Sequence, residues 1–220
     1  MIIAIDGPAA SGKSTTAIGV AKRLGITYLD TGAMYRAVTF GLIENDIKFE
    51  DSSELDNYLK QIKLRLSETK SGVIINLDGR NISKEIRSSK VTENVSEVSA
   101  LKNVRDSMVL IQRKMAKKND CILEGRDIGT VVFPNADFKF FLIADQIVRA
   151  KRRQNDLKKM GEQKSIDNVT TDIIKRDHKD STRKHSPLIK SENAIIIDTS
   201  NLGINKVIDK IVNIVNKKGH

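Results

Sequence analysis

The sequence MIIAIDGPAASGKSTT, residues 1–16, decides the fold of this chain. Its first six residues are apolar and largely β-branched until Asp6, which predicts a short buried strand. Residues 7–14 fit the pattern G-x-x-x-x-G-K-[ST], and residues 13–24 have a helical composition that stops at Gly25. A strand, a glycine-rich loop and a helix in this order predict a phosphate-binding loop in an α/β protein.

The residue types in this loop suit a nucleoside triphosphate. Glycines let the backbone curl so that successive N–H groups point at phosphate oxygens, and the following helix adds its positive N-terminal end. Lys13 is expected to reach the β- and γ-phosphates, and the hydroxyl of Ser14 is expected to ligate Mg²⁺. The residues expected to bind the triphosphate are Gly7, Pro8, Ala9, Ala10, Ser11, Gly12, Lys13, Ser14 and Thr15.

The rest of the chain alternates short apolar runs with helical stretches, which predicts a parallel sheet covered on both faces. The helix at residues 204–217 carries a single apolar stripe, so it is expected to pack on the core. Further strands are expected at residues 26–29, 121–123, 138–142 and 194–197, and further helices at 31–44 and 101–118.

Two segments depart from this alternation. Apolar and polar residues alternate at 62–66 and at 73–77, and Asp78-Gly79 follows as a tight-turn signal, which predicts a small antiparallel sheet. Residues 146–183 are basic and helical with an interruption near Gly161, which predicts two helices joined into a movable flap.

Composition allows one core domain with insertions, since domains commonly have about 100–200 residues and the chain has 220. The net charge of +10 suits either a nucleic-acid binder or an enzyme that concentrates positive charge around phosphorylated substrates. Aromatic residues make up only 4%, with no Trp, so platforms for stacking bases of single strands are scarce.

The remaining composition favours an enzyme of the cytoplasm. No apolar run approaches the roughly 20 residues of a membrane span. The N-terminal residues do not read as a signal peptide, and Cys121 is the only cysteine, which excludes an internal disulfide. We therefore expect a reducing, cytoplasmic location.

The loop motif alone does not choose a reaction. A GTPase would need a guanine-reading Asn-Lys-x-Asp, but the nearest string, at residues 205–208, lacks the Asp. A motor or a helicase would need a larger chain with further modules. A small kinase is the best fit, and a nucleic-acid-stimulated ATPase remains an alternative.

Three charged motifs could form the acceptor side of such a kinase. DTGAMYR at residues 30–36 and EGRDIGT at 124–130 each follow a strand, where ligands of open α/β sheets collect. RDHKDSTR at residues 176–183 places Arg176, Asp180 and Arg183 on one expected helix face. Arginine forks bind phosphate with two hydrogen bonds, so these motifs indicate a phosphorylated acceptor.

Together with the phosphate loop, these motifs in this order resemble the bacterial cytidylate kinases over nearly the whole chain. The resemblance implies an α/β fold with a three-layer core of the P-loop NTPase type and a parallel sheet. It also implies an inserted monophosphate-binding domain with a small antiparallel sheet, and a helical lid. The expected boundaries are residues 1–30, 101–148 and 184–220 for the core, 31–100 for the insertion and 149–183 for the lid.

The resemblance further implies the reaction ATP plus CMP or dCMP to ADP plus the diphosphate, with Mg²⁺. A P-loop kinase for another small phosphorylated or hydroxylated acceptor is the alternative. Arg36, Arg126 and Arg183 would surround the acceptor phosphate, and Asp30 and Thr31 would lie beside the acceptor. The cytosine would be read by Ser96, Arg105 and Asp127, and Asp180 with Arg176 would bind the sugar hydroxyls. The expected catalytic residues are Lys13, Arg126, Arg176 and Arg183. Arg149 and Arg153, with Arg152 beside them, resemble lid arginines that close over ATP.

Physical chemistry agrees with these roles. A carboxylate can accept from the exocyclic amine of cytosine, and uracil reverses the donor pattern, so selectivity against UMP is expected. The acceptor phosphate is largely a dianion at neutral pH, since its second pKa lies near about 6, and needs no general base. We expect direct in-line transfer by a monomer that acts on small molecules, with no role for nucleic acid. Glu124 stands where the family often has Asp, which leaves its reach toward Mg²⁺ open.

Several of these residues also have simpler interpretations. The basic residues at 149–159 could be a solvated helix face, as most charge runs are, and Ser96 could be an ordinary helix residue. His178 and His185 lack partners with metal-ligand spacing, and Cys121 reads as a small buried apolar residue.

Overall fold

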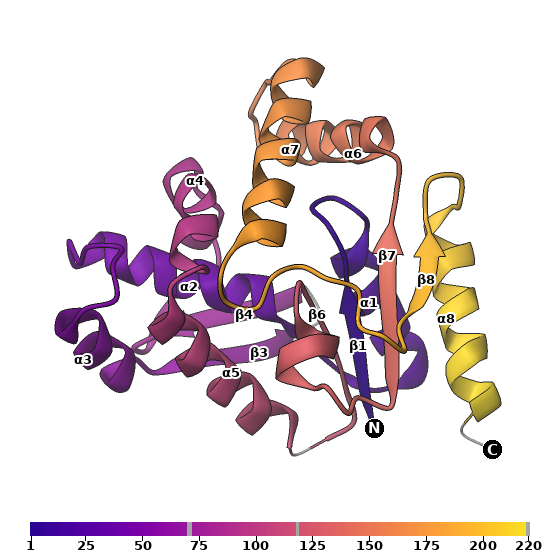
Figure 1. Cartoon of the computed structure of the whole chain (residues 1–220), viewed down its shortest axis with the longest axis horizontal. Helices are drawn as coiled ribbons and strands as arrows, with labels where there is room; N and C mark the ends of the chain where they lie inside the picture. The colour runs from indigo at the N-terminus through magenta and orange to yellow at the C-terminus, as the bar shows by residue number, and fades with distance from the viewer. Residues whose placement is uncertain (70–71, 118, 219–220) are drawn as a thin grey trace. The chain divides into compact units, whose positions relative to one another are not determined.

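Five parallel strands form the main sheet of the computed structural model, which describes residues 1–69, 72–117 and 119–218 (Figure 1). Their order is β2-β6-β1-β7-β8. The strands are β1 (Ile2–Asp6), β2 (Thr27–Asp30), β6 (Cys121–Gly125), β7 (Phe138–Ile143) and β8 (Ile195–Asp198). β1 lies at the centre, where Ile3 pairs with Ile122 on one side and with Phe138 on the other. Each expected strand is confirmed to within two residues.

The chain divides into two compact units. Unit 1 contains Met1–Tyr28 and Asn119–His220, and unit 2 contains Leu29–Lys118. Unit 1 carries the phosphate loop, and unit 2 carries the antiparallel sheet.

Helices flank the sheet in unit 1. They are α1 (Lys13–Leu24), α6 (Gln146–Lys159), α7 (Ile166–Thr182) and α8 (Ile204–Lys218), with a π-helical turn η2 (Ile128–Val132). α1 packs on β1, β6 and α8. The expected stripe of α8 is buried at Val207, Ile208, Ile211 and Val215, although Ile204 at the helix start is exposed. α1 ends at Gly25 in the left-handed conformation, as the sequence predicts.

α6 and α7 form the expected helical pair and pack against each other (Figure 1). Gly161, just after α6, has a φ of 83°, a conformation that glycine adopts without strain. Both helices contribute to a small apolar cluster of Ala150, Leu157, Val169 and Ile173. The side chain of Ala10, from the phosphate loop, packs against this cluster.

Unit 2 contains the expected antiparallel sheet, in the order β3-β4-β5. Its elements are α2 (Thr31–Glu44), α3 (Ser53–Gln61), β3 (Leu64–Thr69), β4 (Gly72–Leu77), β5 (Arg80–Asn81), the 3₁₀ turn η1 (Glu85–Arg87), α4 (Ser89–Val98) and α5 (Lys102–Ala116). Asp78 and Gly79 both have positive φ, at 52° and 87°, so the predicted tight turn is confirmed. The expected end of the α5 helix at Lys118 lies outside the described residues.

Unit 2 contains two helices, α3 and α4, that the sequence pattern does not predict. Each is capped by a serine hydroxyl, since Ser52 accepts from the N–H of Leu55 and Ser88 from that of Val91. In α4 the buried residues Val91, Val95 and Val98 recur at helical spacing. Valine has a lower helix propensity than the straight-chain residues, so this short segment has a weak local signal and depends on packing.

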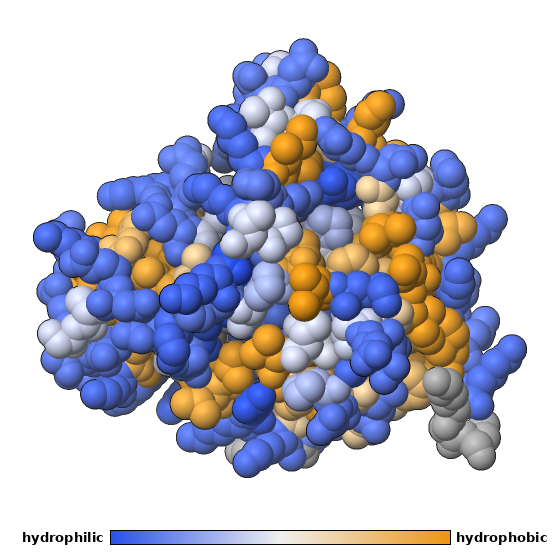
Figure 2. Space-filling view, in the orientation of Figure 1, coloured by the Kyte–Doolittle hydropathy of each residue, from blue (hydrophilic) through white to orange (hydrophobic). Residues whose placement is uncertain are grey.

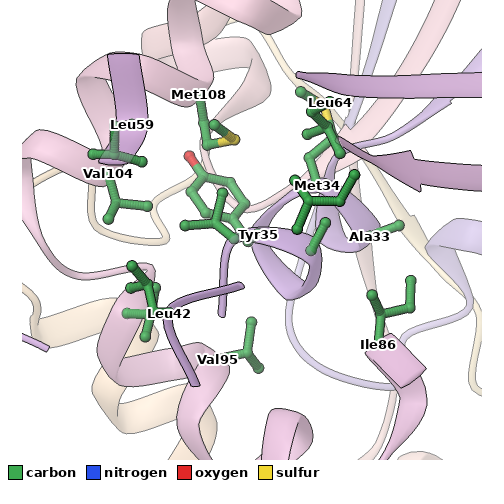
Figure 3. Close-up of a cluster of buried hydrophobic side chains, with 14 of the residues drawn as sticks. Ala33, Met34, Tyr35, Leu42, Leu59, Leu64, Ile86, Val95, Val104 and Met108 are labelled. Carbon is green, nitrogen blue, oxygen red and sulfur yellow. The ribbon is translucent and has the colours of Figure 1, made fainter. Parts of the chain in front are cut away.

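One apolar core fills unit 2. Side chains from α2, α3, α4 and α5 converge on it, with Tyr35, Leu59, Val95 and Met108 among those in Figure 3. Met34 and Tyr35 of α2 are buried in this core, so the core determines which side of α2 faces inward.

The side of the molecule seen in Figure 2 carries mostly hydrophilic side chains, in keeping with a chain in which 30% of the residues are charged. Across the described ranges, we find no helix that combines the length and the apolar character required to cross a membrane.

Candidate active site

The phosphate loop joins β1 to α1 in unit 1, as predicted. Ala10 and Gly12 have φ angles of 56° and 93°, so the backbone is in the left-handed region at two points of the loop. Gly12 also precedes the first turn of α1, where unpaired N–H groups and the helix dipole favour an anion. The expected triphosphate residues Gly7 through Gly12 form the loop, and Lys13, Ser14 and Thr15 begin the helix.

Lys13 lies inside this loop and is 5% exposed. Its Nζ donates to the carbonyl oxygen of Pro8 at 2.7 Å and to Ser11 Oγ at 3.5 Å. Burial, and then repulsion from Arg126, lowers the pKa of Lys13 to about 7. The charged form of Lys13 is therefore unfavourable in the empty loop, and a bound polyanion would stabilise it.

Ser14 and Glu124 are hydrogen-bonded at the start of α1. Ser14 Oγ donates to Glu124 Oε1 at 2.7 Å, and Tyr28 Oη donates to the same oxygen at 3.4 Å. The carboxylate is 6% exposed. A hydroxyl and a carboxylate are the hard oxygen donors that Mg²⁺ prefers, so this pair fits the metal that a triphosphate carries.

Two buried arginine–aspartate pairs follow in the same unit. Arg126 Nε donates to Asp180 Oδ2 at 2.7 Å, and Arg183 Nη2 lies 3.9 Å from Asp127 Oδ1. Burial alone would raise the pKa of Asp180, but Arg126 and then Arg176 outweigh it and hold that pKa below its ordinary value. The carboxylate therefore stays ionised among three arginines, as expected for a group that organises charge around a phosphorylated substrate.

The expected helix face of Arg176, Asp180 and Arg183 is only partly correct. α7 ends at Thr182, and Arg183 follows it with extended backbone angles and donates from Nε to the carbonyl oxygen of Ser186 at 2.7 Å. The backbone leaves the helical region at Arg183, with a ψ of 143°, and Ser186 has a φ of 51°. Arg183 contacts Asp127 from this extended segment. The three- and four-residue spacing of helix faces therefore does not apply to Arg183.

The arginines of α6 contact other parts of unit 1. Arg149 pairs with Asp177 and donates to the carbonyl oxygen of Ala9 at 3.1 Å. Arg152 donates to Oγ1 and to the carbonyl oxygen of Thr199 at 2.9 and 2.7 Å. Thr199 Oγ1 in turn donates to the carbonyl oxygen of Ser11 at 3.0 Å. Arg153 is half-buried on the same helix.

The expected acceptor residues of unit 2 are ordered around α2. Asp30 caps that helix, since its Oδ1 accepts from the N–H of Ala33 at 2.8 Å, and Thr31 is 2% exposed. Arg36 Nη1 donates to Thr92 Oγ1 of α4 at 3.0 Å.

The other two residues expected to read the base are also in unit 2. Arg105 is 2% exposed, donates from Nη1 to the carbonyl oxygen of Ser99 at 2.9 Å, and lies 5.3 Å from the centre of the Tyr35 ring. A guanidinium stacked on a ring and bonded to a carbonyl is held in one orientation. Ser96 is half-buried on α4, and its carbonyl oxygen accepts from Ser99 Oγ at 3.1 Å.

The cytidylate kinase family model matches residues 3–217, which is nearly the whole chain. The chain belongs to the cytidylate kinase family. A cytidylate kinase of Fusobacterium nucleatum is 46% identical over 218 residues, with 99% of this chain and 96% of that protein covered. One from Lactobacillus johnsonii is 44% identical, with 99% and 95% covered. One from Carboxydothermus hydrogenoformans is 44% identical, with 99% and 98% covered.

Solved structures of low sequence identity share the fold. An uncharacterized protein from Eubacterium ventriosum has a TM-score of 0.53 at 12% identity, with 98% of each chain covered. A shikimate kinase from Bacteroides thetaiotaomicron has a TM-score of 0.50 at 11% identity, again with 98% of each covered. At these identities the likeness concerns the fold of the cytidylate kinase chain and not its substrate.

Three further residues, which the sequence motifs did not single out, bind backbone groups of the phosphate loop and η2. The Asp6 carboxylate accepts from the N–H groups of Ile128 and Gly129, Asp177 accepts from that of Ala9, and Thr199 links Arg152 to the loop. Asp6 could have been found, since an acidic residue at the carboxyl end of the first strand is a position where functional groups collect. Asp177 lies in the motif at residues 176–183, but nothing in that motif links it to Ala9, and Thr199 has no local signal.

Proposed function

We propose that this chain transfers the γ-phosphoryl group of ATP to CMP or dCMP and releases ADP and the nucleoside diphosphate. The observation that carries the proposal is the family match over residues 3–217, together with relatives named cytidylate kinase at about 45% identity. The phosphate loop with its buried Lys13, and the buried arginine–aspartate pairs of unit 1, support the same reaction class.

The triphosphate is proposed to bind the N–H groups of residues 7–15, with Lys13 on its β- and γ-phosphates and Arg149 and Arg153 above it. Ser14 and Glu124 would hold Mg²⁺, which when bound neutralises part of the phosphate charge. The hydrogen bond between Ser14 and Glu124 supports this assignment, because it brings two oxygen donors together beside the loop.

The acceptor is proposed to be bound by the residues that the family resemblance implies. Its phosphate would be held by Arg36, Arg126 and Arg183, and its sugar by Asp180 with Arg176. Its cytosine would be read by Asp127, Arg105 and Ser96, with Asp30 and Thr31 ordering the start of α2. We propose residues 31–100 as the monophosphate-binding domain, 149–183 as the lid and the remainder as the core.

The chemistry then needs positioning and charge neutralisation more than proton transfer. The acceptor oxygen belongs to a phosphate that is already a dianion at neutral pH, so it attacks the γ-phosphorus directly and the bond to the β-phosphate oxygen breaks in line. Lys13, Arg126, Arg176 and Arg183 stabilise the negative charge that spreads over the transferred group. A lid that closes over both nucleotides would exclude water and prevent hydrolysis of ATP.

The remaining features of the proposal concern partners and location. We propose a monomer that acts on small molecules without nucleic acid, in a reducing cytoplasm to which a single cysteine is suited. Burial raises the pKa of the Cys121 thiol to about 11, so this cysteine stays a protonated core residue.

A panel of monophosphates in a coupled ADP-release assay tests the function. CMP and dCMP should react at least about 100-fold faster than UMP, AMP and GMP, because a site that hydrogen-bonds one base leaves buried polar groups unpaired with another. Equal rates with all the monophosphates would contradict the assignment of the base-reading residues. Lys13→Ala should abolish turnover while leaving the melting temperature within a few degrees of that of the natural chain.

A further inference from the structure

Both peptide groups of one phosphate-loop residue are held by an ion pair from the two lid helices. The N–H of Ala9 donates to Asp177 Oδ1 at 2.9 Å, and the carbonyl oxygen of Ala9 accepts from Arg149 Nη1 at 3.1 Å. The same Nη1 donates to Asp177 Oδ2, and Arg149 Nε donates to the carbonyl oxygen of Ala144 at 3.1 Å. We call Arg149 and Asp177 the loop clamp.

The loop clamp acts next to the strained part of the loop. Ala10, the neighbour of Ala9, has a φ of 56°, a left-handed conformation that costs free energy in any residue with a Cβ. The side chain of Ala10 packs against the apolar cluster of α6 and α7. Backbone hydrogen bonds at Ala9 and apolar packing at Ala10 therefore hold the loop in its curled form, and both come from the lid helices.

A direct role for Asp177 in binding ATP does not fit this chemistry. A carboxylate would repel a triphosphate, and the Arg149 guanidinium already pairs with it at side-chain exposures of 12% and 20%. The contact also involves the carbonyl oxygen of Ala9, which needs a donor that no phosphate oxygen can supply. An arrangement that satisfies both backbone groups of one residue is suited to fixing the loop.

We propose that Asp177 is a positioning residue for the donor nucleotide, acting through Arg149 and the backbone of Ala9 to preorganise the phosphate loop. This deepens the proposed function and rests on ATP as the donor. It also gives Arg149 a role through the loop, besides the contact with ATP proposed above. Preorganisation lowers the ordering cost of binding, so its loss should weaken ATP and spare the acceptor.

Calorimetry with a non-hydrolysable ATP analogue and, separately, with CMP tests the proposal. Asp177→Ala should raise the Kd of the analogue about 10-fold or more and change that of CMP less than about twofold, because a charge-assisted pair of hydrogen bonds is lost. Asp177→Asn keeps an acceptor for the Ala9 N–H but loses the charge, so it should give an intermediate value. The matched control is Asp172→Asn on the same helix, where an exposed carboxylate pairs with Lys164 and no change is expected.

Three results would overturn the proposal: an unchanged Kd of the analogue, an equal rise for both ligands, or tighter binding of the analogue. The last would mean that Asp177 blocks the loop. A double-mutant cycle with Arg149→Lys provides a second measurement, in which the two effects on analogue binding should combine to less than their sum, and strict additivity would contradict the clamp. Should Asp177→Ala fail to fold, Asp177→Asn and the cycle built on it decide the question.

Binding of the analogue does not depend on the identity of the acceptor. If the natural chain failed to phosphorylate CMP, the proposed function would be wrong, but the effect of the loop clamp on analogue binding could still be measured. If CMP were phosphorylated but the Kd of the analogue did not change in the Asp177 variants, only the loop-clamp proposal would be wrong.

Discussion

Asp6 Oδ2 accepts a hydrogen bond from the backbone N–H of Gly129 at 2.7 Å, which ties the end of β1 to the turn that follows Asp127. The other carboxylate oxygen accepts from the N–H of Ile128 at 2.8 Å. The buried Asp6 carboxylate thus binds two consecutive amides of η2, the turn that directly follows Asp127, which is proposed to read the base. The turn that follows Asp127 is therefore held by a side chain from the first strand.

Replacing this carboxylate should change how stability depends on pH. Burial raises the pKa of Asp6 from 3.8 to about 6, so between these values the folded chain holds a proton that the unfolded chain has lost. The stability that this proton contributes is present below about pH 4 and is lost as pH rises through about 6. Relative to Asp6→Asn, the natural chain should lose up to about 3 kcal/mol of unfolding free energy between pH 4 and pH 7. Urea unfolding of both proteins across this range measures the difference, and a flat difference would contradict the assignment.

Binding of ATP should take up a proton at Lys13. Burial and Arg126 lower the pKa of this amine to about 7, so at pH 8 it is mostly neutral in the free enzyme, and a triphosphate beside it would raise the pKa again. Calorimetry of a non-hydrolysable ATP analogue at pH 8, in two buffers with different ionisation enthalpies, should give different apparent enthalpies. Lys13→Arg stays charged and should abolish this difference. Equal enthalpies for the natural chain would mean that Lys13 is already protonated.

The Glu124 carboxylate should determine how much magnesium the reaction requires. Glu124→Gln keeps the shape of the side chain but removes the charge, so the Mg²⁺ concentration for half-maximal activity should rise about 10-fold. Tyr28→Phe removes only the hydroxyl that donates to Glu124 Oε1 at 3.4 Å and should shift that concentration less than about twofold. A titration of activity with Mg²⁺ at fixed ATP measures both, and an unchanged requirement in Glu124→Gln would place the ion elsewhere.

Asp127 should distinguish the two nucleotides. Asp127→Ala removes the proposed acceptor for the cytosine amine and should weaken CMP binding at least about 10-fold, since a good contact with a base edge is worth about 1–3 kcal/mol. Affinity for the ATP analogue should stay within about threefold. Unchanged CMP affinity in the same calorimetric assay would show that another group reads the base.

Gly41 should tolerate no side chain. A Cβ at this position in α2 would lie 1.7 Å from Tyr58 Oη and 3.1 Å from Leu77 Cδ2, so Gly41→Ala should destabilise the chain by about 2 kcal/mol or more. Adding Tyr58→Phe removes the closest clashing atom and should restore part of that stability. Gly203→Ala is the control, because a Cβ there meets nothing within 4 Å. Thermal melting of the four proteins tests this, and a melting temperature of Gly41→Ala equal to that of the natural chain would show that the core of unit 2 can shift.

Much of the fold could be predicted because its signals are local. The apolar strands, the phosphate loop and the Asp78-Gly79 turn each occupy a few consecutive residues whose chemistry allows few conformations. α3 and α4 were missed because they are short, polar on one side and stabilised by packing on the core of unit 2. Arg183 was placed on a helix because spacing alone does not reveal that α7 ends at Thr182.

The amino-acid sequence alone predicts a triphosphate loop, a parallel sheet with an antiparallel insertion, and three charged motifs, each with at least one arginine, in the order found in cytidylate kinases. Only the tertiary structure decided which distant groups hold these motifs in place, such as Asp6 on the amides of η2 and Asp177 on that of Ala9. The physical reason is that a hydrogen bond from a side chain to a remote backbone group leaves no periodic pattern in the sequence. It forms only after the hydrophobic effect has brought the segments together.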